Sequence, residues 1–449
     1  MLTSLKRLRI AALGAGMCSL LQADHHVASD FDRVLVAPPT TLEGLPGEGP
    51  FRIHNENFLK RWVQRRSSWI NRAEEDQGAV VFFGDSITQG WPNLSNYFPG
   101  MKSANRGIGS DTTRGMLIRL QEDVIDLNPS AVVILAGTND LADKASAEMI
   151  AGNIKRILDA LEAHNSELPI VLCQLLPSSP EKNRAPEDIK EINERIAAVA
   201  KGDPRITVLD TYTLFANEDG NARIEEFPDL LHLNNNGYGK WAAALRPILA
   251  TLGLLETDTE DFQQEEGYVS LFNGRTLNGW GFRITPPPNP NRKPNPNAPP
   301  RTVITEPENF YGQRASSDGR YAAINGRLVV TTPTEGRRIQ QLWTTREFAN
   351  DFILKLEFRA TPNADSGVFL RGRQLQCRDY PLAGPYTELT RYKPQDWNEL
   401  VITVKGNTAR CECNGELLEA AFEIPDNGPI GLEGDRGQME YRRIRIKEF

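Results

Sequence analysis

Histidine is scarce in this chain of 449 residues, which has only five of them: His25, His26, His54, His164 and His232. Histidine is the side chain that most often serves as a general base, so nucleophilic catalysis would have few bases to choose from here. Only His232 lies three residues after a carboxylate, in the segment Asp229-Leu230-Leu231-His232. The sequence therefore singles out this pair.

Cysteine is equally rare, and its spacing excludes a zinc-type cluster of paired cysteines. Cys173 lies in an apolar, strand-like run, which predicts a buried free thiol. Cys411 and Cys413 alternate along one expected strand, so they share a face but do not suit a bridge to each other. A disulfide from Cys377 to either of them stays open. We expect neither a metal nor an organic cofactor.

Long apolar runs are missing too, since no segment reaches the roughly 20 residues that a membrane span needs. At the start, Lys6, Arg7 and Arg9 precede an apolar run that ends just before Ala23, which predicts a signal peptide over residues 1–23 and a secreted or periplasmic protein. Lipidation at Cys18 is a minor alternative. The net charge of −8 disfavours a nucleic-acid partner.

The first half of the chain alternates short apolar runs with helical patterns. The runs cover residues 79–83, 131–135, 170–176 and 206–209, and each is apolar on both faces, as in parallel strands covered by helices on both sides. An amphipathic helix is expected over residues 58–70. We predict a flexible segment over residues 24–50, a three-layer α/β/α domain over residues 51–255 and a linker over residues 256–266.

The second half, residues 267–449, has the period of half-buried strands. Apolar and polar residues alternate over residues 352–359, and turn signals such as Asn325-Gly326 and Asn414-Gly415 separate further short runs. We therefore predict an all-β sandwich. Further strands are expected over residues 326–331, 367–371, 398–405, 410–413 and 441–447.

A serine at the end of the first strand is the expected nucleophile. The run Val80-Val81-Phe82-Phe83-Gly84-Asp85-Ser86 delivers its hydroxyl to the edge of the sheet where ligands bind. His232 would remove the proton of Ser86 and Asp229 would orient the imidazole. Backbone amides near Ser86 and in the turn around Gly109 and Ser110, with the amide of Asn139, would stabilise an oxyanion.

Blander interpretations exist for the same residues. The pair Asp229 and His232 could be a solvated loop pair, and Asn139 could merely cap the helix after it. Asp85 is expected to orient the nucleophile turn through side-chain to backbone hydrogen bonds.

Four blocks resemble the SGNH, or GDSL-type, hydrolase family, namely residues 84–88, 105–113, 137–140 and 229–232. The resemblance implies a flavodoxin-like fold and a serine esterase that uses Ser86, Asp229 and His232, with Ser86, Ser110 and Asn139 as oxyanion donors. Two departures are visible. Ile87 replaces the leucine of the motif, and Ser110 replaces the usual oxyanion glycine.

The β half resembles the 3-keto-disaccharide hydrolase domain family in segments such as Leu271-Phe272-Asn273-Gly274 and Gly428-Pro429-Ile430-Gly431-Leu432. The resemblance implies a concanavalin-like jelly roll. Residues expected on a glycan-facing surface are Asp365, Arg371, Glu433 and Asp435.

Together these features predict an exported esterase that removes acyl groups, foremost acetyl, from an acylated glycan or another carbohydrate ester. Two alternatives stay open. In one, the β half is the main catalyst and cleaves 3-keto glycosides, as a hydrolase or a lyase, with the esterase as an accessory. In the other, the β half is a non-catalytic glycan-binding module.

Overall fold

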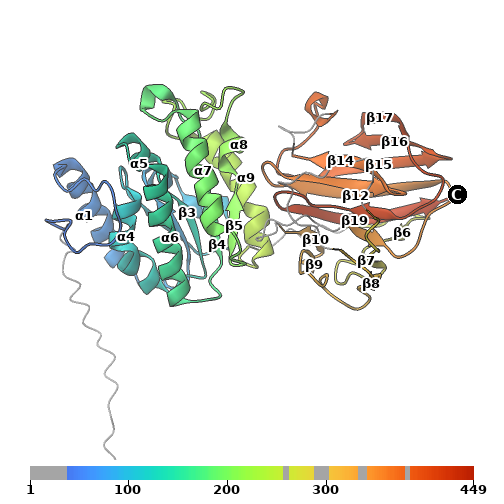
Figure 1. Cartoon of the computed structure of the whole chain (residues 1–449), viewed down its shortest axis with the longest axis horizontal. Coiled ribbons are helices and arrows are strands. Elements are labelled where there is room, and N and C mark those ends of the chain that lie inside the picture. Colours follow the sequence, from blue (N-terminus) through green and yellow to red (C-terminus); the bar gives the residue numbers. More distant parts are fainter. Residues whose placement is uncertain (1–37, 256–261, 288–302, 332–340, 380–384) are drawn as a thin grey trace, which may run out of the picture.

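The computed structural model describes residues 38–255, 262–287, 303–331, 341–379 and 385–449, which form an α/β domain followed by a β domain (Figure 1). The predicted signal peptide and residues 256–261 of the predicted linker lie outside the described residues. Within the described part of the chain, no helix is both long and apolar enough to cross a membrane.

The α/β domain is built on a parallel sheet with strand order β2-β1-β3-β4-β5, which is the flavodoxin-like order. Four strands coincide with the predicted apolar runs, because their side chains are buried on both faces. The strands are β1 (Val80–Gly84), β2 (Ser103–Gly107), β3 (Ala131–Leu135), β4 (Ile170–Cys173) and β5 (Ile206–Leu209).

Helices cover both faces of this sheet. Residues of α4, α6 and α7 pack with Val81 and Phe83 on one face, and residues of α9 pack with Val80 and Phe82 on the other, so the three-layer prediction is confirmed. The helices are α1 (Glu56–Ile70), α2 (Ser86–Gln89), α3 (Leu94–Tyr97), α4 (Thr113–Asp123), α5 (Thr138–Ala142), α6 (Ala147–His164), α7 (Pro186–Ala200), α8 (Thr211–Phe215) and α9 (Asn235–Thr251), with short 3-10 turns η1 (Ile125–Leu127) and η2 (Pro180–Lys182).

Strand β2 was missing from the prediction, since its sequence Ser-Ala-Asn-Arg-Gly is polar. It forms the sheet edge, and its polar side chains find specific partners. Asn105 donates to the carbonyl of Thr88, and the buried guanidinium of Arg106 donates to Asp76. These tertiary hydrogen bonds replace the apolar burial that marks the other strands.

The segment before the domain makes hydrogen bonds to the domain where the structure describes it. Residues 38–50 were expected to be a loose lead-in, but Glu48 exchanges two backbone hydrogen bonds with the side chain of Asn153. The hydroxyl of Thr112 also donates to the carbonyl of Pro50. Residues of α4 and α6 and the residue before α4 thus supply partners for the backbone of this segment, and its flexibility stays a prediction.

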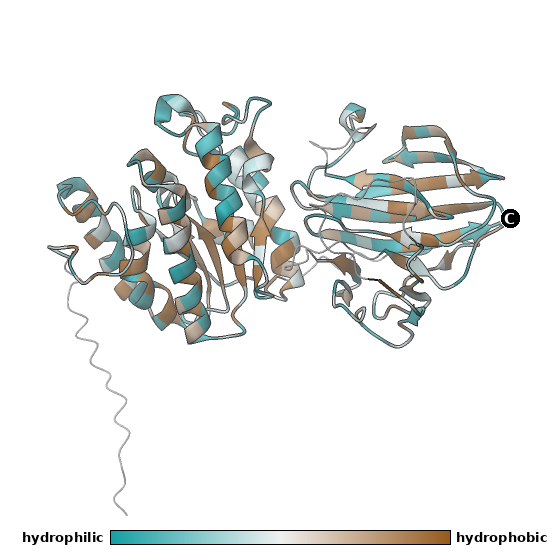
Figure 2. Cartoon of the chain, viewed as in Figure 1, coloured by the Kyte–Doolittle hydropathy of each residue, from teal (hydrophilic) through white to brown (hydrophobic). Residues whose placement is uncertain are grey.

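The β domain is a sandwich of two antiparallel sheets, consistent with a jelly roll. One sheet has the order β17-β16-β15-β12-β19-β10-β9, with β6 beside β19, and the other has the order β14-β13-β18-β11-β7-β8. Apolar side chains alternate along the strands and face the space between the sheets (Figure 2). All the strand runs predicted for this half are present.

The strands of this domain are β6 (Val269–Ser270), β7 (Trp280–Phe282), β8 (Glu308–Asn309), β9 (Tyr321–Ile324), β10 (Arg327–Val330), β11 (Leu342–Thr344), β12 (Phe352–Ala360), β13 (Asp365–Leu370), β14 (Arg373–Arg378), β15 (Asn398–Lys405), β16 (Thr408–Cys413), β17 (Glu416–Glu423), β18 (Ile430–Leu432) and β19 (Met439–Glu448). One 3-10 turn, η4 (Pro385–Glu388), follows β14.

The disulfide that the sequence left open is not formed. Cys173, Cys377, Cys411 and Cys413 are all free and buried, and burial raises the pKa of the thiols of Cys411 and Cys413 to about 12. Both side chains face the core, as the alternation along β16 predicted. They behave as small apolar residues.

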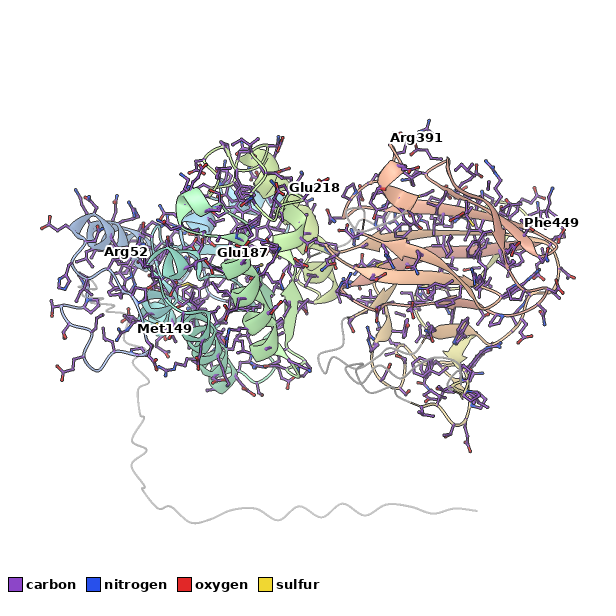
Figure 3. The ribbon with its side chains drawn as sticks, turned by 45° about the horizontal axis from the view of Figure 1, so that its top comes forward. Arg52, Met149, Glu187, Glu218, Arg391 and Phe449 are labelled. Atoms are coloured by element: carbon purple, nitrogen blue, oxygen red, sulfur yellow. The ribbon has the colours of Figure 1, made fainter. Side chains whose placement is uncertain are left out.

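The two domains touch through a few polar contacts at one end of the sandwich. The amide of Asn363 donates to Asp210, and the amide of Gln438 donates to Thr251 and to the carbonyl of Pro247 in α9. Phe449 lies at the opposite end of the β domain (Figure 3). In the predicted linker, Glu265 pairs with Arg445 and Lys355, so this residue belongs to the β domain.

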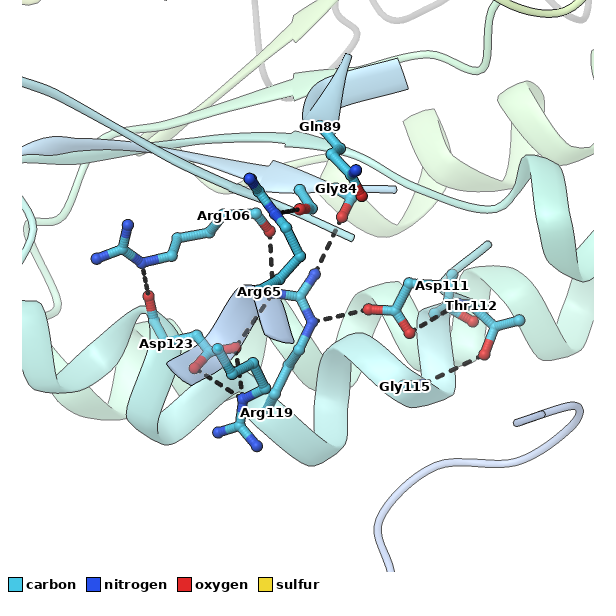
Figure 4. Close-up of polar contacts among 12 residues, drawn as sticks. Arg65, Gly84, Gln89, Arg106, Asp111, Thr112, Gly115, Arg119 and Asp123 are labelled. Carbon is cyan, nitrogen blue, oxygen red and sulfur yellow. Dashed lines mark hydrogen bonds and ion pairs between the residues drawn. The ribbon is translucent and has the colours of Figure 1, made fainter. Parts of the chain in front are cut away.

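A fully buried arginine joins the elements that meet at the edge of the α/β sheet (Figure 4). From α4, Arg119 binds the carboxylate of Asp111 at 2.7 Å and that of Asp123 at 3.3 Å. It also donates to the carbonyls of Gly84, at 3.0 Å, and Arg106, at 2.9 Å. One side chain therefore connects the ends of β1 and β2 with the turn that precedes α4.

We expect Arg119→Met to destabilise the protein by about 3–5 kcal/mol, because it leaves the buried carboxylate of Asp111 without its cation. The matched control is Arg195→Met, which breaks an exposed pair with Glu191 and should change stability by less than about 1 kcal/mol. Urea unfolding of both variants measures the difference. Equal losses of unfolding free energy in the two variants would show that the buried network contributes no more to stability than the exposed pair.

Candidate active site

Ser86 lies at the first turn of α2, directly after β1. Asp85 caps this helix, since its Oδ1 accepts a hydrogen bond from the amide of Ile87 at 2.9 Å, as expected. The phenol of Tyr238 in α9 donates to the carbonyl of Ile87 at 2.8 Å. The nucleophile helix is thus held from both sides, and the hydroxyl of Ser86 has a fixed position.

The structure brings Ser86, His232 and Asp229 together in one chain of contacts. Ser86 Oγ lies 3.0 Å from His232 Nε2, and His232 Nδ1 lies 2.7 Å from Asp229 Oδ2. The other oxygen of Asp229 accepts the backbone amides of Leu231 and His232. A solvated pair would not require this alignment with a serine 146 residues away in sequence.

The carboxyl group of Asp229 stays ionised over a wide pH range. Partial burial opposes its ionisation, but hydrogen bonds from the amide and imidazole of His232 and from the amide of Leu231 lower its pKa to about 2. The imidazole of His232 is 44% exposed, so the site opens to solvent. This geometry lets an anion stabilise an imidazolium that forms beside it.

The turn after β2 contains Ser110, whose backbone amide can act as a donor although the residue is not a glycine. Ser110 has φ 68°, the left-handed conformation that glycine adopts most easily, so the serine accepts the backbone of the usual glycine. The amide of Gly109 donates to Gln89 Oε1 at 2.5 Å and is therefore not available to a substrate. Among the described residues, the amides of Ser86 and Ser110 have no acceptor.

Asn139 does not cap α5, because Gly137 is the capping residue and the Asn139 side chain turns elsewhere. Its Nδ2 donates to the carbonyl of Asp111 at 2.9 Å, and its Oδ1 accepts from Arg184 at 3.4 Å. These contacts fix the orientation of the amide and leave the second N–H of Nδ2 for another acceptor. The capping interpretation of Asn139 is wrong.

Two further side chains hold the turn at Gly109 and Ser110. The guanidinium of Arg61, from α1, donates to the carbonyl of Gly109 at 3.0 Å and approaches Ser110 Oγ at 3.4 Å. Gln89, from α2, binds the amide of the same glycine. The turn is thus bound both to α2, which carries the nucleophile, and to α1.

Sequence reasoning missed Arg61, Gln89, Arg119 and Arg184. Arg119 carried a signal, because a lone charge within the apolar run Met116-Leu117-Ile118-Arg119-Leu120 suggests a buried ion pair. The other three sit on polar helix faces or in loops, and no local pattern distinguishes them from surface residues.

The predicted glycan-facing residues of the β domain do not all meet. Asp365 and Glu433 share the outer face of the six-stranded sheet, and Asp435 is exposed nearby. Arg371 is elsewhere, because it is buried and its guanidinium donates to the carbonyls of Phe348, Ala349, Asn350, Gly406 and Pro425. All five of its N–H groups are used, so it holds loops together and cannot face a glycan.

Within the described part of the chain, no group of three His, Cys, Asp or Glu side chains is placed to hold a metal ion. The arrangement at Ser86 instead provides a hydroxyl, a base, an anion behind the base and aimed N–H donors. These are the elements that acyl transfer needs.

The buried carboxyl group of Asp85 makes the stability of the folded protein depend on pH. Burial raises the pKa of its carboxyl from 3.8 to about 6, and Oδ2 has no hydrogen-bond partner among the described residues. Because the folded pKa lies above the unfolded one, this group favours the folded state at low pH, and that contribution is lost as the pH rises from about 4 to about 6.

We therefore expect Asp85→Asn to become more stable relative to the wild type as the pH rises from about 4 to about 7, by on the order of 3 kcal/mol. The asparagine keeps the acceptor for the Ile87 amide but cannot ionise. Urea unfolding of both proteins across this range measures the difference. A difference that does not change with pH would contradict the assignment.

Comparison with known proteins matches both halves of the chain to known families. Residues 82–240 match the model of the GDSL-like lipase/acylhydrolase family, and residues 267–447 match the 3-keto-alpha-glucoside-1,2-lyase-like domain. The helix that carries Arg61 lies outside the matched range.

Sequence relatives of the first half include human platelet-activating factor acetylhydrolase IB subunit alpha1, which is 29% identical over 221 residues, covering 48% of this chain and 89% of that protein. The human alpha2 subunit is 28% identical over 210 residues, covering 45% and 89%. Similar solved structures include a GDSL-like lipase from Bacteroides thetaiotaomicron, with 28% identity, a TM-score of 0.37 and coverage of 42% of this chain and 96% of that one. An acetyl xylan esterase has 24% identity, a TM-score of 0.31 and coverage of 36% and 96%.

The family models cover the sheet edge that carries Ser86 and nearly the whole β sandwich. The chain therefore joins a GDSL-like lipase/acylhydrolase domain to a 3-keto-alpha-glucoside-1,2-lyase-like domain, and it is a hydrolase that acts on ester bonds.

Proposed function

We propose that Ser86, His232 and Asp229 are the catalytic triad of an esterase. Ser86 Oγ attacks the ester carbonyl carbon while His232 Nε2 accepts the hydroxyl proton, and Asp229 stabilises the imidazolium. The single observation that carries this proposal is the continuous contact from Ser86 to Asp229, at 3.0 Å and 2.7 Å.

Attack turns the carbonyl oxygen into an oxyanion. We assign the amides of Ser86 and Ser110 and Nδ2 of Asn139 as its hydrogen-bond donors. This assignment is supported by the absence of acceptors for the two amides among the described residues and by the fixed orientation of Asn139. Gly109 is not assigned as an oxyanion donor, because its amide already donates to the side chain of Gln89. One such donor contributes roughly 3–4 kcal/mol to the stability of a transition state.

The tetrahedral intermediate then collapses to an acyl-enzyme. His232 gives its proton to the leaving alkoxide, which departs as an alcohol. A water molecule next attacks the acyl carbon as His232 takes its proton, and the serine oxygen leaves with that proton restored. The products are one carboxylic acid and one alcohol, and no cofactor takes part.

An acetyl ester of a carbohydrate is the substrate class that we favour. The acetyl preference is supported by the names of the sequence relatives, which are acetylhydrolases. The carbohydrate is supported by the second domain, whose family name refers to a glucoside. A secreted or periplasmic location, proposed from the leader sequence, would let the protein reach such a carbohydrate.

A second candidate function has its own observation. The match of residues 267–447 to the 3-keto-alpha-glucoside-1,2-lyase-like domain favours a glycoside-cleaving activity in the β domain. In that case the esterase would clear substituents from the sugar. Full-length Ser86→Ala incubated with a 3-keto glucoside separates the two activities, because product formation without ester turnover requires a second catalytic site.

We expect Ser86→Ala to lower kcat for p-nitrophenyl acetate by about four or more orders of magnitude, because the nucleophile and the proton path are both lost. The matched control is Ser95→Ala, which changes an exposed serine in the neighbouring helix α3. The control should keep wild-type turnover, and both should melt at the wild-type temperature. Full turnover by Ser86→Ala would refute the mechanism.

A further inference from the structure

A buried arginine lies beside one of the assigned oxyanion donors without an ion pair of its own. Arg184 is 6% exposed. Its guanidinium donates to the carbonyl of Thr138 at 2.9 Å, to the hydroxyl oxygen of the same residue at 2.8 Å, to the carbonyl of Lys182 at 2.6 Å and to Oδ1 of Asn139 at 3.4 Å. None of these acceptors among the described residues is a carboxylate, although arginines are rarely this buried unless they are paired.

Two carboxylates act on Arg184 without touching it. Burial lowers the pKa of the guanidinium, while Asp85 and Asp143 raise it through space. Asp143 already pairs with Arg52 at 2.8 Å, and burial raises the pKa of the Asp85 carboxyl to about 6. Because arginine keeps its proton in proteins, a positive charge that no direct partner neutralises lies at this edge of the sheet.

The loop that carries Arg184 contacts both sides of the proposed site. Arg184 lies between η2 and α7, and its amide donates to the carbonyl of Ser179 at 3.2 Å. Earlier in the same loop, the hydroxyl of Ser178 donates at 2.7 Å to the carbonyl of Leu230, two residues before His232. The loop after β4 therefore reaches the oxyanion donor at one end and the segment that carries the base at the other.

The contact with Arg184 decides which end of the Asn139 amide is bound to protein. A guanidinium can only donate, so it meets Oδ1, and the carbonyl of Asp111 can only accept, so it meets Nδ2. Both contacts impose the same orientation and leave the second N–H of Nδ2 as the free donor of this amide. A cation at the amide oxygen also polarises the amide, which makes that N–H a stronger donor.

We propose that Arg184 is a positioning residue that strengthens Asn139 as an oxyanion donor. The proposal rests on the esterase mechanism, in which negative charge appears on the carbonyl oxygen only after Ser86 attacks. A polarised donor stabilises that charged state more than the neutral ester before attack. Loss of Arg184 should therefore lower kcat and kcat/KM together and leave KM nearly unchanged.

A purely structural role of Arg184 would have a different signature. Its contacts with Thr138 hold the start of α5, and a general disturbance there would cost the same fraction of activity with or without the side-chain amide of Asn139. An effect transmitted through Asn139 disappears once that amide is removed. A double-mutant cycle separates the two cases.

The test combines Arg184→Gln with Asn139→Ala in the full-length protein, with p-nitrophenyl acetate as the substrate. We expect Arg184→Gln alone to lower kcat by about tenfold or more, with KM within about threefold of the wild type. When residue 139 is already alanine, the same change should lower kcat by less than about threefold. Arg184→Lys keeps a cation in the loop and should retain more of kcat than Arg184→Gln.

The matched control is Arg52→Gln. The charge of Arg52 is near enough to lower the pKa of Arg184, but its guanidinium donates to Asp143 rather than to Asn139. Its loss should leave kcat within about twofold of the wild type.

Equal fold losses from Arg184→Gln in the two backgrounds, or a wild-type kcat for either single variant, would overturn the proposal. So would a loss confined to KM. If Arg184→Gln does not fold, Arg184→Lys decides in the same cycle, because its smaller loss should likewise vanish without the amide of Asn139. Turnover that survives Ser86→Ala would instead refute the mechanism on which the proposal rests.

Discussion

The buried guanidinium of Arg119 is the interaction on which the catalytic edge depends. It binds the carbonyl of Gly84, two residues before Ser86, and the carboxylate of Asp111, one residue after Ser110. A charge removed from water is tolerated only when it is paired and its hydrogen bonds are made. Any displacement of β1 relative to the turn would break these contacts, so the network fixes the distance between nucleophile and oxyanion donors.

A second layer of contacts refines that geometry. Gln89 and Arg61 hold Gly109, while Arg184 orients Asn139 through its amide oxygen. These side chains therefore position the proposed oxyanion donors, Ser110 (next to Gly109) and Asn139, without being donors to the substrate themselves. The strained backbone at Ser110 persists because its neighbours on both sides are held.

Sequence reasoning reached the parts of this architecture that have a local or periodic signature. Buried parallel strands are apolar on both faces, so four of the strands in the α/β sheet were predictable, and the spacing of Asp229 and His232 marked the base. Strand β2 was not predictable, since its polar side chains are satisfied only by distant groups such as Asp76. Arg371 was misplaced for the converse reason, because its carbonyl partners come from loops that the sequence does not bring together.

The β domain shows the same limit at the scale of a whole sheet. Its strands could be predicted from alternation, but the sheets are formed by pairs of strands distant in sequence, such as β11 with β18.

The most direct test of the central claim is the detection of an acyl-enzyme on Ser86. Rapid mixing of the wild-type protein with p-nitrophenyl acetate, followed by acid quenching and peptide mass spectrometry, should show one acetyl group, located on the peptide that contains Ser86. The same experiment with His232→Ala should show almost none, because the serine lacks its base. Undiminished ester turnover with no acetylated Ser86, or with the acetyl group on another residue, would contradict the account.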